Sequence, residues 1–268
     1  MKPTELRQAI REGKNVFGTM VAMCRTPDVM VLVANAGMDF VLIDTEHGSF
    51  TTESVADLCR VARGWDVTAI LRVPGRGPTY VSRSLDFGAN GLMMPRIETA
   101  EEAAEVVNWA RYAPEGNRGL ALGGAGQDYQ RVEDPLKTMV EVNESTVVVV
   151  QIESADAVSR IDEIAAVPGI NVLLIGPMDL SATLGIPGQL DHPDFVASVR
   201  EVVRAARENG ISSGIHAPSA EMCRFWRDEG MTFLAASSEA GMISSGLAAA
   251  RADFDAEDAP EEAPGGMF

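Results

Sequence analysis

Short apolar segments alternate along the chain with longer amphipathic stretches. Eight segments of five to seven residues are rich in aliphatic and β-branched side chains on both faces, and they lie at 16–22, 39–44, 67–73, 91–95, 147–152, 171–176, 211–217 and 232–237. Strands that are apolar on both faces are typical of a buried parallel sheet. Consecutive strands of such a sheet need a crossover connection, which is usually a helix.

Helical patterns fill nearly every gap between these segments. We predict helices at 28–37, 51–63, 78–88, 98–110, 132–142, 155–166, 193–209, 218–229 and 239–251. Eight strand and helix repeats in about 250 residues have the size and order of a single-domain α/β protein, the (β/α)8 TIM barrel. An open doubly wound sheet is the alternative, but it would normally carry a glycine-rich phosphate turn after the first strand, where this chain has Met20-Val21-Ala22-Met23-Cys24.

Two stretches lie outside this alternation. Residues 112–131 are irregular and glycine-rich, and they are too long for a minimal connection, so we expect a lid or an interface loop. The barrel domain is expected to span residues 1–251. Residues 252–268 are acidic and rich in Ala, Pro and Gly, and we expect them to form a mobile tail.

Composition narrows the possible partners and the compartment. The 268 residues carry a formal charge of −17, which repels nucleic-acid phosphates and anionic membrane surfaces, so we expect neither as a partner. Cys24, Cys59 and Cys223 are widely spaced and form no CxxC pair, a pattern typical of a reducing cytoplasm. No apolar run approaches the roughly 18 residues that a membrane helix needs.

Two carboxylates follow neighbouring predicted strands. Glu153 follows the fifth strand and Asp179 follows the sixth, and the carboxyl ends of barrel strands open on one face. Hard divalent cations such as Mg²⁺ or Mn²⁺ prefer oxygen ligands, so the pair predicts a metal site, although each residue alone could instead cap a helix or a turn. Gln151 faces the same side as Glu153, and it either binds a ligand oxygen or forms a polar plug satisfied by neighbouring strands.

Histidines supply a candidate base at this face. His47 follows two acids at the end of the second strand, where an imidazole can move a proton near neutral pH. His192 precedes a proline at a helix start, and we interpret it as structural. His216 ends the seventh strand and either lines the same mouth or only packs there.

Basic side chains separate two possible mechanisms. Arg72 ends the third strand at the edge of a dry core, where it meets either a substrate anion or, as the alternative, Asp44 or Glu46. Lysine is scarce, and all three residues lie away from the predicted mouth: Lys2, Lys14 and Lys137. A Schiff-base mechanism needs a lysine there, so it is disfavoured.

Six runs in this order resemble the HpcH/HpaI aldolase/citrate lyase family over most of residues 5–250. They are DFVLIDTEHGSF (39–50), LRVPG (71–75), LDFGANGLMMPRIETAEEA (85–103), RYAPEGNRGLAL (111–122), VVVVQIES (147–154) and LLIGPMDLSATLG (173–185). The resemblance implies a (β/α)8 barrel and a metal-dependent lyase that uses Mg²⁺, Mn²⁺ or Co²⁺. Its substrate would be a 4-hydroxy-2-oxo acid, cleaved to pyruvate (or another 2-oxo acid) and an aldehyde through the pyruvate enolate, or formed from them.

The resemblance also implies roles for individual residues. His47 would be the general base, Arg72 would stabilise the enolate, and Asp86 would reach across a subunit interface to raise the basicity of the histidine. Glu153 and Asp179 would hold the metal. The oxygens of pyruvate would be bound by Gln151 and by the backbone of Met178 and Asp179. A homo-oligomer is implied as well, a hexamer or a trimer-based assembly with swapped terminal helices.

Departures from the family pattern leave the second substrate open. Met20, Arg96, Met178 and His216 stand where we expect other residues in these aldolases. Arg96, Arg118 and His216 would suit a more polyanionic substrate, so a Claisen-type citrate or malyl synthase or lyase is an alternative function for the same site. A catalytically inactive barrel that acts as a binding subunit is a further alternative.

Overall fold

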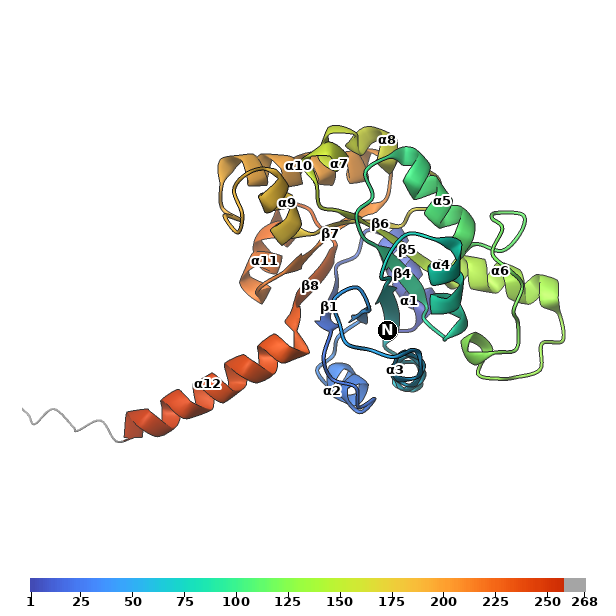
Figure 1. Cartoon of the computed structure of the whole chain (residues 1–268), viewed down its shortest axis with the longest axis horizontal. Helices are drawn as coiled ribbons and strands as arrows, with labels where there is room; N and C mark the ends of the chain where they lie inside the picture. Colours follow the sequence, from blue (N-terminus) through green and yellow to red (C-terminus); the bar gives the residue numbers. More distant parts are fainter. Residues whose placement is uncertain (258–268) are drawn as a thin grey trace, which may run out of the picture.

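The computed structural model describes residues 1–257, and its strands close into one barrel (Figure 1). Eight parallel strands are hydrogen-bonded in chain order, and the first pairs with the last. They are β1 (Val16–Val21), β2 (Phe40–Asp44), β3 (Thr68–Arg72), β4 (Gly91–Met94), β5 (Val147–Ile152), β6 (Val172–Ile175), β7 (Ser212–Ala217) and β8 (Phe233–Ser238). The predicted (β/α)8 TIM barrel is confirmed.

Most of the surrounding helices also lie where the sequence predicts them. They are α2 (Val29–Asn35), α3 (Thr52–Gly64), α4 (Pro78–Asp86), α5 (Ala100–Ala110), α6 (Pro135–Ser145), α10 (Pro193–Glu208) and α11 (Ala220–Asp228). Five of these seven helices, α3, α5, α6, α10 and α11, are capped by a side chain at their start, as at Thr51, which accepts the Ser54 N–H at 3.2 Å. The Nδ1 of His192 accepts the Asp194 N–H at 3.2 Å at the start of α10, so the structural interpretation of this histidine is confirmed.

Short helices are where the predictions fail. The helix α1 (Pro3–Arg11), whose apolar side chains Leu6, Ala9 and Ile10 are buried, was not predicted. The helix α9 (Pro177–Thr183) lies where only a turn was expected. The predicted helix 155–166 is two pieces, α7 (Ala155–Ser159) and α8 (Ile161–Ala165), because the backbone leaves helical geometry at Arg160. The pieces α7, α8 and α9 have only five to seven residues, which leave too few apolar positions for a clear period. The apolar residues of α1 do have helical spacing, at positions 6, 9 and 10, so this helix could have been predicted.

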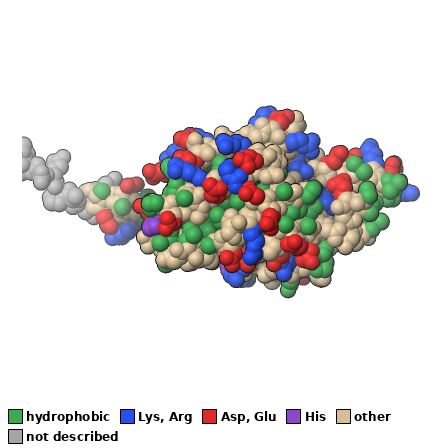
Figure 2. Space-filling view, turned by 90° about the horizontal axis from the view of Figure 1, so that it is seen from above, with side chains coloured by type: hydrophobic (Ala, Val, Ile, Leu, Met, Phe, Trp, Pro, Cys, Tyr) green, Lys and Arg blue, Asp and Glu red, His purple; other side chains and the backbone are tan. Residues whose placement is uncertain are grey.

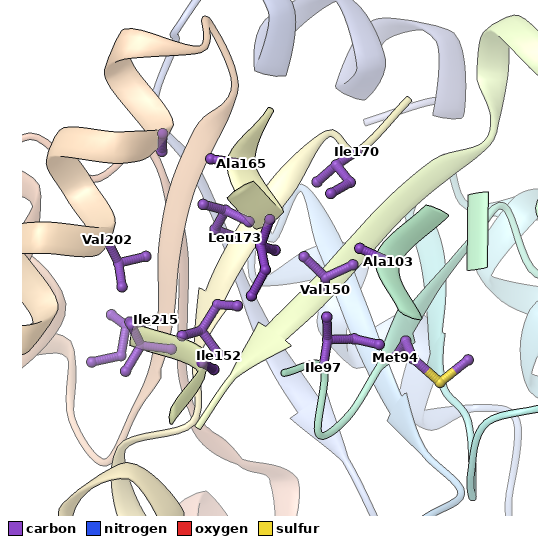
Figure 3. Close-up of a cluster of buried hydrophobic side chains, with 14 of the residues drawn as sticks. Met94, Ile97, Ala103, Val150, Ile152, Ala165, Ile170, Leu173, Val202 and Ile215 are labelled. Atoms are coloured by element: carbon purple, nitrogen blue, oxygen red, sulfur yellow. The ribbon is translucent and has the colours of Figure 1, made fainter. Parts of the chain in front are cut away.

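Strand alternation divides the core into an inner and an outer layer. Side chains such as Phe40, Leu42 and Ile70 fill the barrel, and α1 covers the amino-terminal end of this inner cluster. The opposite faces of the strands pack against the helices, in one cluster around β1 to β3 and in a larger one around β4 to β8. Figure 3 shows part of the larger cluster, where Val150 and Ile152 of β5 point towards side chains of the covering helices.

The last helix does not pack on the barrel as the others do. The helix α12 (Glu239–Glu257) contacts β1 and β8 only near its start and then extends away from the body (Figures 1 and 2). It also continues past residue 251, the expected end of the barrel domain, so residues 252–257 of the expected tail are helical. The remaining tail positions, 258–268, lie outside the described residues.

The irregular segment 112–131 lies against α3 and α4. Arg63 of α3 donates to Asp128 at 2.6 Å, and Arg118 donates to Asp86 at the end of α4 at 2.7 Å. A 3-10 turn, η1 (Ala125–Gln127), contacts α4. No residue of the segment lines the cavity at the mouth of the barrel, and its expected role as a lid or an interface loop stays a prediction.

Two absences concern the described residues only. None of the helices between residues 1 and 257 combines the length and apolar character needed to cross a membrane. The cysteines Cys24, Cys59 and Cys223 all have free thiols.

Candidate active site

The inward-facing residues at the carboxyl ends of the strands surround a cavity of about 280 Å³. Register explains the grouping, because Asp44 lies beside Arg72 and Gln151 beside Leu174 on neighbouring strands, with alternate residues turned inward. Polar lining comes from six residues on four strands and α9: Arg72, Gln151, Asp179, His216, Ser237 and Ser238. Met20, Met93 and Leu174 form an apolar floor.

Arg72 is held by two carboxylates at the wall of this cavity. Its Nε and Nη2 donate to the two oxygens of Asp44 at 2.8 and 2.6 Å, and its Nη1 lies 3.5 Å from Glu46. Burial alone would lower the pKa of Arg72, but the hydrogen bonds and charges of Asp44 and Glu46 outweigh it and raise that pKa. Arg72 therefore forms the ion pair with Asp44 and Glu46 that was the alternative to a substrate contact, and it also lines the cavity.

Glu153 is free of the capping role that was its structural alternative. The start of α7 is capped by Ser154, which accepts the Ala157 N–H at 3.1 Å. Glu153 instead turns inward, where its Oε1 accepts the backbone N–H of Arg96 at 2.8 Å and its Oε2 accepts from the Gln151 amide. A side chain at position 176 would lie 2.5 Å from both Gln151 and Glu153, so only glycine fits beside them.

Glu153 has neighbours of its own sign. Burial, together with the negative charges of Asp179 and Glu46, raises its pKa to about 7, against the lowering effects of the Arg96 N–H and of Arg72. Asp179 is thus close enough to Glu153 for its charge to act on it, and the expected metal role of the pair stays a prediction. Asp179 does not cap α9, since it lies within the first turn of that helix, whose N-cap residue is Gly176.

The charges at the mouth match a divalent cation. Four carboxylates and two guanidinium groups act on one another there, which leaves an excess of two negative charges when all four acids are ionised: Asp44, Glu46, Glu153 and Asp179 against Arg72 and Arg96. Within residues 1–257, no three His, Cys, Asp or Glu side chains group tightly enough to enclose an ion by themselves. Mg²⁺ is usually bound by one or two carboxylates, with water or substrate in its remaining coordination positions, so two carboxylates suit this ion.

Gln151 carries an unsatisfied acceptor. The residue is 4% exposed, its amide nitrogen donates to Glu153, and its Oε1 is buried with no hydrogen-bond partner among the described residues. A buried amide oxygen normally has a partner. The polar-plug alternative required neighbouring strands to satisfy this group, and they do not, so the oxygen is available to a ligand in the cavity that Gln151 lines.

His47 lies at the rim rather than in the cavity wall. Its side chain is 62% exposed, and its Nε2 lies 3.8 Å from Glu46. The backbone N–H groups of Glu46 and His47 donate to Asp44 at 3.0 and 3.2 Å, so the Asp44 carboxylate organises both Arg72 and the turn that carries the histidine. Sequence reasoning treated Glu46 and Asp44 only as alternative partners of Arg72, and this organising role was missed.

His216 does line the cavity. Its Nε2 donates to the Ser237 carbonyl at 2.8 Å, a role open only to the tautomer with its proton on Nε2. Burial lowers the pKa of His216, and the nearby Arg72 lowers it further, so the ring is neutral at pH 7. His216 therefore lines the mouth of the barrel, the first of its two expected roles, and does not only pack there.

Of three further site candidates, Asp86 and Arg118 lie outside the cavity, and Met178 lines it. Asp86 does not line the cavity, and its carboxylate pairs with Arg118 of the same chain. Arg118 is buried above the Tyr112 ring, 4.6 Å from its centroid, so it does not reach a substrate in the cavity. Met178, in contrast, lines the cavity and is 57% exposed at the start of α9.

One buried acid near the rim escaped the sequence analysis. Glu239, the first residue of α12, is 6% exposed, and its carboxylate accepts the backbone N–H groups of Ala22, Met23 and Cys24. The contact fixes the loop after β1 and the direction in which α12 leaves the barrel. Its position directly after a strand was an available signal, but its partners are more than 200 residues away in the sequence.

The chain matches a known protein family. The model of the HpcH/HpaI aldolase/citrate lyase family matches residues 20–245. The chain belongs to this family. The family member from Roseobacter denitrificans named hydroxypyruvate/pyruvate aldolase is 32% identical over 238 residues, which cover 88% of this chain and 91% of the relative. The predicted lyase class is therefore confirmed at the level of the family.

Solved structures of family members superpose over nearly the whole chain. The HpcH/HpaI aldolase from Desulfitobacterium hafniense has a TM-score of 0.89 and 32% identity, and the match covers 97% of this chain and 99% of that one. The citrate synthase SbnG has a TM-score of 0.84 and 28% identity, with 94% and 98% covered. Both aldolase and citrate synthase chemistry thus occur on this barrel among its relatives.

Proposed function

We propose that this protein is a divalent-metal-dependent aldolase that cleaves a 4-hydroxy-2-oxo acid into pyruvate, or a close 2-oxo acid, and an aldehyde, and that also catalyses the reverse addition. The observation that carries the proposal is the convergence of Arg72, Asp179 and Gln151 on one cavity, with the buried Glu153 hydrogen-bonded to Gln151 beside it and the Gln151 oxygen left unpaired. Aldolases are prominent among the family members to which the chain is similar.

Glu153 and Asp179 would hold the cation, which supplies a Lewis acid that draws charge towards the 2-oxo oxygen of the substrate. Mg²⁺ and Mn²⁺ suit the all-oxygen donor set, and Co²⁺ is a third candidate. The two excess negative charges at the mouth are the reason for expecting a dication rather than a neutral or anionic group.

Substrate binding is assigned to the cavity wall. Arg72 keeps three guanidinium hydrogens beyond the two that it donates to Asp44, and these can meet the negative charge on the enolate oxygen. The Gln151 side chain and the backbone of Met178 and Asp179 would orient the carboxylate and carbonyl oxygens of the 2-oxo acid. The apolar floor excludes water from the carbon that becomes nucleophilic.

His47 is proposed as the base. In the cleavage direction it takes the proton of the C4 hydroxyl, the C3–C4 bond breaks, and its electrons pass into the enolate of the 2-oxo acid. The C4 carbon leaves as the aldehyde, and a proton then returns to C3. We place Asp86 of a neighbouring subunit beside this histidine, a role that requires Asp86 to leave Arg118 or to share it in the assembly.

A lysine-based mechanism has no suitable residue. Lys2 and Lys14 precede β1 and thus belong to the amino-terminal end of the barrel, and Lys137 is 72% exposed on α6. None of the three lines the cavity. Borohydride should therefore fail to trap pyruvate on the protein, because a Schiff base needs a lysine at the reacting carbon.

Proton exchange at the pyruvate methyl group tests the proposal. We expect NMR spectra in D₂O to show deuterium incorporation with Mg²⁺ present and none after treatment with EDTA. Loss of the methyl signal that continues at full rate in EDTA, or exchange that is absent with Mg²⁺, Mn²⁺ and Co²⁺ alike, overturns it.

A Claisen-type condensation is the second candidate, favoured by the similarity to the citrate synthase SbnG. Formation of citrate from oxaloacetate and acetyl-CoA, without pyruvate exchange, would support it over the aldolase. A barrel that binds neither metal nor 2-oxo acid would support the third alternative, an inactive binding subunit.

We also propose that the protein acts as a homo-oligomer in the cytoplasm, a hexamer or an assembly based on trimers. The support is α12, which leaves its own barrel with apolar side chains facing solvent: Met242, Ile243, Leu247 and Phe254. Exposed apolar surface of this kind marks a contact with another chain. A second copy of this protein is the partner that the family resemblance implies, and the acidic composition disfavours nucleic acid and membranes.

A further inference from the structure

Arg96 is a guanidinium that the proposed reaction does not yet use. It follows β4, and its backbone N–H donates to Glu153 at 2.8 Å. Its neighbours Pro95 and Ile97 are buried, while its own side chain is 71% exposed. The backbone is thus fixed at the site, and only the guanidinium reaches outward.

Backbone strain accompanies this placement. Arg96 has a φ of 56°, in the left-handed region that a residue with a Cβ rarely adopts. The bond to the Glu153 carboxylate and the burial of both neighbours hold it there. Consequently the side chain departs next to the proposed metal ligand, not along the outer surface of the barrel.

Charged side chains of alternating sign connect the cavity to Arg96, in the order Arg72, Glu46, Arg96. Arg72 lines the cavity with its side chain 11% exposed, and Glu46 lies beside it at 3.5 Å with 12% exposure. The other oxygen of Glu46 lies 3.8 Å from the Nε of Arg96, beyond hydrogen-bond distance. Arg96 therefore marks the solvent side of the mouth, one side chain away from the cavity wall.

The two guanidinium groups differ in what they can still bind. Arg72 already donates two hydrogen bonds to Asp44 and has Glu46 at 3.5 Å, whereas the Arg96 guanidinium makes no hydrogen bond within residues 1–257. A planar guanidinium with unused donors matches a carboxylate in bidentate geometry. The surrounding carboxylates would otherwise repel an anionic substrate.

We infer that Arg96 binds a carboxylate carried by the aldehyde substrate, remote from its carbonyl carbon, and so selects an acidic aldehyde over a neutral one. The inference rests on the proposed aldolase function. The 2-oxo acid is placed in the cavity by Arg72 and Gln151, so the aldehyde must approach from the open side, where Arg96 lies. The product of addition would then be a dicarboxylate.

The test compares two aldehydes of similar length in addition to pyruvate with Mg²⁺. Succinic semialdehyde carries the remote carboxylate, and pentanal lacks it. We expect the ratio of kcat/KM for succinic semialdehyde to that for pentanal to fall about tenfold or more in Arg96→Gln, mainly through KM. Arg96→Lys, which keeps the charge but loses the planar fork, should fall in between.

Arg207→Gln is the matched control. Arg207 is an exposed arginine near the end of α10, so its loss changes net charge equally without touching the mouth, and the ratio should stay at the wild-type value. Circular dichroism melts check that the variants are folded. An unchanged ratio in Arg96→Gln, or an equal loss for both aldehydes, overturns the inference.

Pyruvate exchange in D₂O separates this failure from that of the proposed function. Wild-type protein that exchanges the methyl protons, together with an unchanged ratio in the variant, leaves the aldolase standing and removes Arg96 from the acceptor site. Wild-type protein that exchanges no protons with any of the three metals overturns both.

Discussion

Asp44 and Arg72 are register partners on β2 and β3 and form a two-pronged ion pair with their side chains at 2.8 and 2.6 Å. Because Asp44 is also the acceptor for the turn that carries Glu46 and His47, one buried carboxylate positions a proposed substrate ligand and the proposed base together. Its removal therefore has consequences for stability and for catalysis.

Asp44→Asn should destabilise the fold by about 3 kcal/mol, because it leaves the guanidinium of Arg72 buried without its partner. Urea denaturation at pH 7 measures this value. Asp57→Asn, which breaks the exposed pair with Arg60, should cost under about 1 kcal/mol and serves as the control. Equal losses in the two variants would contradict the assigned importance of the buried pair.

The same pair predicts a pH dependence of stability. Arg72 holds the pKa of Asp44 below its ordinary value of 3.8, so the ionised carboxylate is more stabilising in the folded state than in the unfolded chain. The difference in unfolding free energy between wild type and Asp44→Asn should be constant above about pH 5 and should shrink as the pH falls below about 4. A difference that grows on acidification would show the opposite sign of shift.

Removal of one metal ligand should weaken binding of Mn²⁺. Glu153→Gln and Asp179→Asn should each reduce the affinity by about tenfold or more, since a neutral amide is a weaker ligand for a hard cation. Calorimetric titration of the protein with Mn²⁺ measures it without reference to activity. Asp162→Asn, whose residue pairs with Arg204 on the outer helices, should bind as the wild type does.

Replacement of the proposed base should separate chemistry from binding. His47→Asn is expected to slow aldol cleavage by about 100-fold or more while it leaves the Mn²⁺ affinity close to that of the wild type. His192→Asn is the control, because asparagine is also a good residue for a helix start and His192 lies away from the mouth. Near-normal cleavage by His47→Asn would move the role of base to another group.

Charge placed on α12 should break the assembly. Ile243 and Leu247 are 48% and 69% exposed on the protruding helix. The double variant Ile243→Glu/Leu247→Glu should elute as a monomer, while wild-type protein and Leu136→Glu, changed at an exposed position on α6, remain oligomeric by light scattering. A monomeric wild type would contradict the proposed oligomer.

Much of the site could be predicted because strand ends are visible in the sequence. Glu153, Asp179, Arg72 and His216 each follow or end a β-branched run, and a parallel barrel brings all such ends to one face. The sequence alone could not distinguish a functional role for these residues from a structural one, such as the capping of a helix. Ser154 and Glu153 are adjacent, for example, and only the hydrogen bond to Ala157 shows which of them caps α7.

Long-range partners were beyond the reach of the pattern. Arg118 was a candidate for substrate binding, but its actual partners are Asp86 and Tyr112, and the loop that carries it packs on α3 and α4. Glu239 was not singled out at all, although its carboxylate holds the backbone of residues 22–24. Hydrophobic periodicity specifies which face of an element is buried, and it carries no information about which polar groups meet across two hundred residues.

The alternation of apolar strands and amphipathic helices was enough to determine the barrel, because a two-sided apolar strand can be buried only in a sheet covered on both faces. The order of polar residues at the strand ends was enough to nominate the mouth and its acids. Only the tertiary structure decided the state of each group there: the twofold hold of Asp44 on Arg72, the raised pKa of Glu153 and the unused donors of Arg96. Those properties depend on distance and burial, which arise when separate strands are brought side by side.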